Sequence, residues 1–129
     1  MKCERGSAAV EFALVTPVLL LVLLGMVEFG RAWNARQTVT EAARAGARVA
    51  AVAEQASADS ARKAVFRVLK GAALDTSKAV ITVQGETGNQ GTPTTVKVQY
   101  SYPFLFLSGA SAGNKRSLLL QSSAIMRRE

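Results

Sequence analysis

A continuous apolar run near the N-terminus constrains this chain more than any other feature. The run covers Phe12–Val27, and Thr16 is its one polar residue. Extended back to Ala8 it reaches about twenty residues, interrupted by Glu11. A helix of about twenty residues is about 30 Å long, which matches the hydrocarbon core of a bilayer. We therefore expect residues 7–27 to form a transmembrane helix.

Composition narrows the class of protein further. The 129 residues suffice for one domain, and they carry 16 Lys and Arg, 9 Asp and Glu, one Cys and no His. These counts exclude the common His/Cys zinc sites and disulfide frameworks. The net charge of +7 fits nucleic acid or an anionic membrane surface. Because the apolar run implies a membrane, we expect inner-membrane lipid as the first partner, and not nucleic acid.

Glu11 is the anomaly within the run. A carboxylate inside a bilayer costs about 2.5–3.5 kcal/mol and indicates a functional site. Gly6 lies five positions earlier, where a short segment with Lys2 and Arg5 meets the run. If the chain is cut after Gly6, Ser7 becomes the N-terminus and carries a positive α-amine. The Glu11 carboxylate can then pair with the Ser7 amine of a neighbouring, staggered helix, and each charge relieves the desolvation of the other.

These residues resemble the start of a type IV prepilin. Such a chain has a short basic leader, a glycine such as Gly6, a carboxylate such as Glu11 and then an apolar stretch. The resemblance implies that a prepilin peptidase removes residues 1–6 at the cytoplasmic face, and that Glu11 and Phe12 serve in assembly. We also expect Pro17 to kink the helix and to ease its extraction from lipid, since proline removes one backbone hydrogen bond.

Two other topologies stay open. An ordinary signal peptide cut after Ala32 would release a soluble domain that begins at Trp33. An uncleaved anchor would keep Met1. Two indications of the orientation of the span disagree. The arginines that follow the run outnumber the basic residues before it, and the positive-inside rule then places the C-terminus in the cytoplasm. The cleavage motif requires the reverse, and we follow it: one span in the bacterial inner membrane and a periplasmic head.

Residues 28–56 continue the helical pattern as a periplasmic stem. They contain no Pro and are rich in Ala and Arg, which favour helices. Small residues recur at steps of three and four, at Val39, Ala43, Gly46, Ala50 and Ala53. We expect this face to pack on the protein's own sheet more than on a neighbouring helix. A continuous helix from Ser7 to about Ala56 would be about 75 Å long.

The stem extends the resemblance. Glu28-Phe29-Gly30-Arg31, Asn34 and the segment Ala42–Arg48 are similar to the TadE-like family, from about Gly6 to Ala53. These are small pseudopilins, or minor pilin-like proteins, of the tight-adherence, Flp-type pilus machinery. The resemblance implies leader cleavage, a membrane helix and a role in pilus assembly and cell adhesion. The implied partners are the prepilin peptidase, other pilins or pseudopilins and the assembly platform.

Residues 57–129 are expected to form a small head of helix and strands. The predicted fold class of the chain is therefore α+β and pilin-like. A second helix is expected from about Asp59 to Lys70, with Gly71 as its C-terminal cap. Ala79–Gln84 and Thr94–Tyr102 predict an antiparallel hairpin, and Ser117–Met126 a third strand. The apolar face of the middle strand would hold Val96, Val98, Tyr100 and Tyr102. Phe104–Leu107 could pack under the sheet, lie at the membrane interface or contact a partner.

The sequence contains no recognisable catalytic constellation. There is no His base, and Cys3 lies in the predicted leader. The glycines of Gly85–Thr92 precede no helix, so a phosphate-binding loop is absent. We therefore expect no enzyme, no metal, no cofactor and no small-molecule substrate. The alternative to a pilus component is a signal-anchored or secreted periplasmic binding or envelope module.

Overall fold

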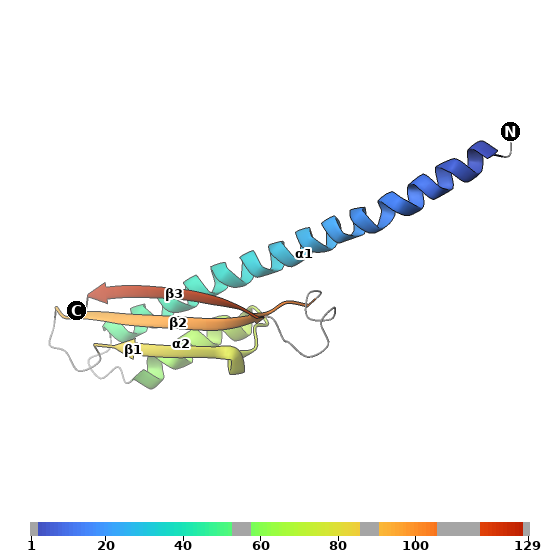
Figure 1. The fold of residues 1–129 in the computed structure, drawn as a ribbon. Helices are drawn as coiled ribbons and strands as arrows, with labels where there is room; N and C mark the ends of the chain where they lie inside the picture. Colours follow the sequence, from blue (N-terminus) through green and yellow to red (C-terminus); the bar gives the residue numbers. More distant parts are fainter. Residues whose placement is uncertain (1–2, 53–57, 86–90, 106–116, 128–129) are drawn as a thin grey trace.

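The computed structural model describes residues 3–52, 58–85, 91–105 and 117–127. Its element order is α1 (Cys3–Val52), α2 (Ala58–Gly71), the 3-10 turn η1 (Thr76–Lys78), β1 (Ala79–Gln84), β2 (Pro93–Pro103) and β3 (Ser117–Arg127). The predictions for residues 1–2, 53–57, 86–90, 106–116 and 128–129 lie outside the described residues. The α+β fold class, with one long N-terminal helix, a short second helix and three antiparallel strands, is confirmed (Figure 1).

The long helix α1 covers the predicted transmembrane and stem segments as one continuous helix. It is described from Cys3, so it also includes part of the predicted leader before Ser7. Its last described residue is Val52, and the predicted end near residue 56 lies outside the described residues. Its 50 residues correspond to about 75 Å. Pro17 lies inside the helix, which continues through it.

The second helix α2 ends differently from the prediction. Gly71 belongs to the helix, and the residue with a positive φ is Ala73, at 56°. The Leu74 N–H donates to the Leu69 carbonyl at 3.0 Å, and the Ala73 N–H donates to the Lys70 carbonyl at 3.0 Å. These two bonds form a Schellman motif. The cap predicted at Gly71 is therefore wrong by two positions, because alanine here adopts the conformation that usually requires glycine.

The sheet is a meander in the order β1-β2-β3, with both pairs antiparallel. Ala79 lies opposite Tyr100, so the predicted hairpin is confirmed. Along β2, side chains alternate between the core and the opposite face. The predicted apolar face is buried: Val96, Val98, Tyr100 and Tyr102.

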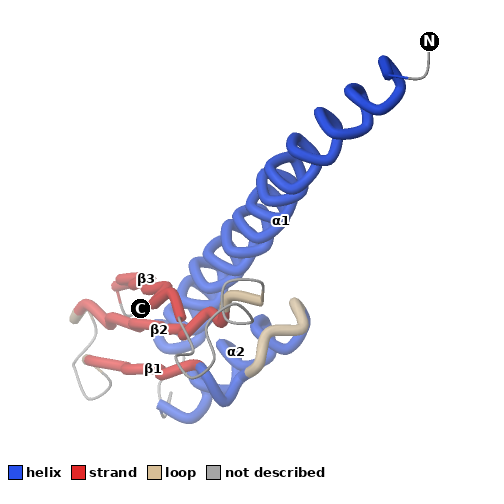
Figure 2. Tube along the Cα trace, turned by 45° about the vertical axis from the view of Figure 1, so that its right-hand side comes forward, coloured by secondary structure: helices blue, strands red, loops and turns tan. Residues whose placement is uncertain are grey.

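Both helices pack on one face of this sheet (Figures 1 and 2). The C-terminal half of α1 supplies small residues to the core, among them Ala42, Ala43 and Ala47. A Cβ at Gly46 would lie 2.6 Å from Cγ2 of Val65 on α2 and 3.2 Å from Cγ1 of Val96 on β2. The small-residue face therefore packs on the protein's own elements, as predicted. Its last member, at position 53, lies outside the described residues.

Candidate functional site

The N-terminal half of α1 projects away from the head as an uncovered apolar rod (Figure 2). Its large apolar side chains between Val10 and Val27 are 37–72% exposed. Within the part of the chain that the structure describes, this is the one helix apolar and long enough to cross a membrane. Thr16 fits such a setting, because its hydroxyl donates to the Phe12 carbonyl at 2.6 Å and needs no other partner.

The residues predicted for processing and assembly all lie on this rod. Ser7 and Glu11 are one helical turn apart, on the same side of α1. Glu11 and Phe12 are both exposed, so they face whatever surrounds the rod. No atom beyond the neighbouring helix backbone lies within 4 Å of a Cβ built at Gly6. The structure brings these residues together on one terminal segment, and their roles stay predictions.

The boundary between rod and head is marked by Glu28, directly after the apolar run. Its side chain is buried, and Oε1 accepts a hydrogen bond of 2.9 Å from the backbone N–H of Leu105, just after β2. Among the described residues, Oε2 has no hydrogen-bond partner. The contact joins positions 77 residues apart and fixes the end of the sheet at the level where the run ends.

Sequence reasoning did not predict this contact. In the sequence, Glu28 belongs to the family pattern, and its partner is a backbone N–H, which residue type does not indicate. The sequence signal for this contact is a carboxylate at the first polar position after a long apolar run. Of the open interpretations of 104–107, packing under the sheet holds for Phe104, which lies against the core. Leu105 is exposed.

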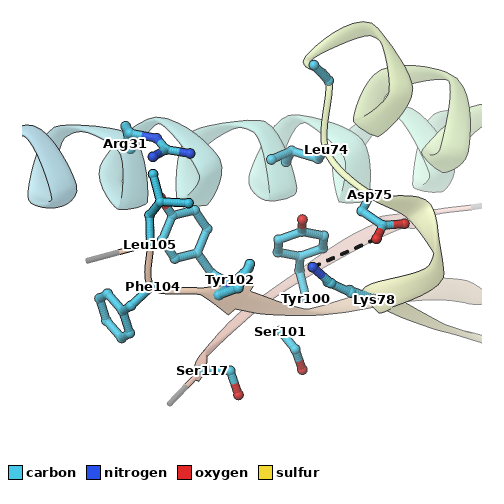
Figure 3. Close-up of a pocket in the computed structure, with 12 residues that line it drawn as sticks. Arg31, Leu74, Asp75, Lys78, Tyr100, Ser101, Tyr102, Phe104, Leu105 and Ser117 are labelled. Atoms are coloured by element: carbon cyan, nitrogen blue, oxygen red, sulfur yellow. Dashed lines mark ion pairs between the residues drawn. The ribbon is translucent and has the colours of Figure 1, made fainter. Parts of the chain in front are cut away.

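A pocket of about 580 Å³ lies beside this junction, between α1, the segment before β1 and the end of β2 (Figure 3). Asp75 accepts hydrogen bonds from the Ser77 hydroxyl at 2.7 Å and the Ser77 N–H at 3.0 Å. These bonds lower the pKa of the Asp75 carboxyl, and Lys78 pairs with it at 3.8 Å. Burial raises the pKa of both Tyr100 and Tyr102, so their hydroxyls stay protonated at neutral pH.

The acidic groups of this pocket are paired or uncharged. Its carboxylate is already engaged by Ser77 and Lys78, and its tyrosines are neutral. No group of three or more His, Cys, Asp or Glu side chains that could hold a metal ion occurs within the described ranges. Most of the exposed large apolar side chains of the described residues lie on the rod and at its junction with the head.

Comparison with known proteins gives one match. Residues 6–48, about a third of the chain, match the family model described as TadE-like protein. The match covers the rod and most of the stem, and it confirms the resemblance that the sequence predicted there. No curated protein and no solved structure matches the chain significantly.

Proposed function

We propose that this chain, which is TadE-like over residues 6–48, is a pseudopilin or minor pilin-like component of a tight-adherence, Flp-type pilus. The match to that family supports association with this pilus machinery. In the proposal, a prepilin peptidase cuts between Gly6 and Ser7. The rod, residues 7–27, then lies in the bacterial inner membrane with the head in the periplasm, and it joins or primes a pilus-like fibre.

The observation that carries the proposal is the exposed carboxylate of Glu11 on an otherwise apolar rod. The head does not cover it, so another molecule has to compensate a charge whose burial in lipid costs about 2.5–3.5 kcal/mol. The α-amine of a cleaved Ser7 on a neighbouring subunit is a partner of the right sign. Pro17 lies inside the same rod, and the backbone hydrogen bond it removes would ease extraction of the helix from lipid.

The cleavage step is tested at Gly6. Gly6→Leu should block leader removal in cells that contain the peptidase, so the protein keeps Met1 by mass spectrometry, whereas the wild type starts at Ser7. Gly25→Leu is the matched control, because a Cβ at either glycine meets nothing within 4 Å. Normal processing of Gly6→Leu, or a wild-type start at Trp33, would contradict the proposal. A start at Trp33 would support the secreted periplasmic module instead.

The assembly step is tested at Glu11. Glu11→Gln keeps the shape of the side chain and removes its charge, so the leader should still be cut while pilus formation falls. Glu41→Gln is the control, since Glu41 is an exposed carboxylate on the same helix outside the apolar run. Normal piliation of Glu11→Gln would remove the role assigned to this residue.

A further inference from the structure

The end of the head nearest the rod carries exposed apolar side chains that the core does not use. Two come from α1, Phe29 and Trp33, which are 69% and 51% exposed and stack with ring centroids 6.2 Å apart. Three come from the ends of the strands: Leu105, Leu118 and Leu119, each more than 40% exposed. We call these five residues the rim.

The rim lies at a defined height along α1. The hydrogen bond between Glu28 and the Leu105 N–H holds the end of β2 one residue past the last apolar residue of the run. Ser117 pairs with Pro103, so β3 begins at this same end of the sheet. Figure 1 shows α1 leaving the head where β2 ends and β3 begins. The strand ends therefore meet the rod where it would leave the hydrocarbon.

The headgroup layer extends about 5–7 Å beyond the hydrocarbon on each side of a bilayer. The Glu28–Leu105 bond, one residue past Val27, falls inside this layer, and the backbone of Trp33 lies at its outer edge. Trp33 is six residues, or about 9 Å, beyond Val27. Helical side chains lean toward the N-terminus, so the indole reaches back toward the rod. Tryptophan is enriched at this depth, because its ring is apolar and its N–H donates a hydrogen bond.

An apolar groove joins the rim to the rod. It has a volume of about 390 Å³ and is lined from Gly25, inside the apolar run, through Phe29 and Trp33 to Arg36, with Leu118 on the opposite wall. The groove thus runs about 16 Å along α1, from the depth of acyl chains to a guanidinium. Its lower end is continuous with the surface that faces lipid.

The charges near the rim also favour phospholipid. Arg31 and Arg36 flank it on α1. Glu28, which lines the same groove, is 5% exposed and bonded to Leu105, so it is not presented to headgroups. Glu41 is exposed and lines a neighbouring cavity with Trp33 and Arg36, but Arg44 lines that cavity too and the helix carries Glu41 farther from the rod. Asp75 is already paired with Lys78. The rim therefore offers apolar surface flanked by a net positive charge, which fits anionic headgroups.

We propose that the rim lies in the phospholipid headgroup layer, so that the head rests on the membrane instead of standing clear of it. This contact with the headgroup layer involves β3 as well as α1, and it does not depend on the role in the pilus. Either orientation of the span gives the same contact.

Trp33 is the one tryptophan in the chain, so its fluorescence reports on the rim directly. The full chain is reconstituted in vesicles of phosphatidylethanolamine and phosphatidylglycerol. We expect a blue-shifted emission relative to an aqueous indole, with stronger quenching by bromines near the glycerol than by bromines near the chain ends. Emission typical of water without quenching would overturn the proposal. A blue shift without quenching that disappears on dilution into lipid would also overturn it, because a second copy would then cover the rim.

The contact of β3 with the headgroup layer is tested with spin labels on β3, in a Cys3→Ser background. Leu119→Cys and Ile125→Cys are a matched pair, because both positions are exposed, at 60% and 67%, on the same face of one strand. They are about 20 Å apart along it, and Leu119 is nearer the rod. We expect the ratio of oxygen to nickel-chelate collisions at Leu119 to be several-fold that at Ile125. Equal, water-like ratios at both positions would show that the head stands clear of lipid.

Discussion

The close approach at Gly46 makes a sharp prediction for the stability of the head. Gly46→Ala adds one methyl group where α1 meets α2 and β2. The added Cβ would lie 2.6 Å from Val65 Cγ2, and an ordinary contact needs at least 3.4 Å. Val65 and Val96 are fully buried and β-branched, so neither side chain has room to rotate away. The helices and the sheet must therefore separate.

The cost follows from two opposing effects. Overpacking a buried contact costs up to about 3 kcal/mol. Replacing glycine by alanine inside a helix stabilises the helix by about 1 kcal/mol. The net loss in the free energy of unfolding is therefore at most about 2 kcal/mol. For a packed unit of this size, that limit corresponds to a fall in Tm of about 8–16 °C.

The measurement is unfolding of the full chain in detergent, followed by near-ultraviolet circular dichroism of the buried Tyr100 and Tyr102. Gly30→Ala is the matched control on the same helix, because a Cβ there meets nothing within 4 Å. It should be neutral or stabilising. If Gly46→Ala unfolded at the same temperature as Gly30→Ala, the close approach of α1 to α2 would be wrong.

Three further substitutions test local features of the head. Ala73→Gly should raise the free energy of unfolding by about 0.5–1 kcal/mol. The left-handed conformation costs alanine about 1–2 kcal/mol, and the greater freedom of glycine in the unfolded chain offsets part of what is gained by removing that cost. A lower thermal midpoint would contradict the Schellman cap. Tyr102→Phe should leave the free energy of unfolding at neutral pH unchanged or raise it by up to about 1 kcal/mol, since the buried hydroxyl has no hydrogen-bond partner among the described residues. A clear loss of stability in urea unfolding would show that the hydroxyl has a partner. Burial raises the pKa of Tyr100 and Tyr102, so these tyrosines lose their protons at lower pH in the unfolded chain than in the folded one. Their contribution to the free energy of unfolding should be fully present below about pH 10 and should be lost as pH rises through the higher folded pKa. Tyr100→Phe should reduce this loss in a pH titration of Tm.

The parts of the fold that follow local patterns could be predicted from the sequence. Alternation in Thr94–Tyr102 predicted both a strand and its buried face, because one face of this sheet is covered and the other is not. The step of three and four through Val39, Ala43 and Gly46 predicted the packed face of the stem, since only small residues allow the close contacts seen there.

The features that sequence reasoning missed depend on backbone groups or on distant pairing. The cap at Ala73 uses carbonyls of the preceding turn, and residue type favoured Gly71 instead. The bond from Leu105 to Glu28 spans 77 positions and involves a backbone donor. Such a contact emerges only when the sheet, the stem and the end of β2 are placed together, so the height of the rim could not be derived from the apolar run.

The distribution of large and small apolar residues along α1 separates folding from assembly. Small residues face the head, where two helices and a sheet must come close. Large apolar residues cover the rod, and the described part of the head leaves them exposed. A substitution on the rod should therefore leave the head intact. Glu11→Gln should unfold at the same urea concentration as the wild type, and Gly46→Ala should insert into membranes normally while its head is destabilised. If Glu11→Gln shifted the unfolding midpoint, the rod would take part in the core, and its apolar surface would not be reserved for lipid and neighbouring subunits.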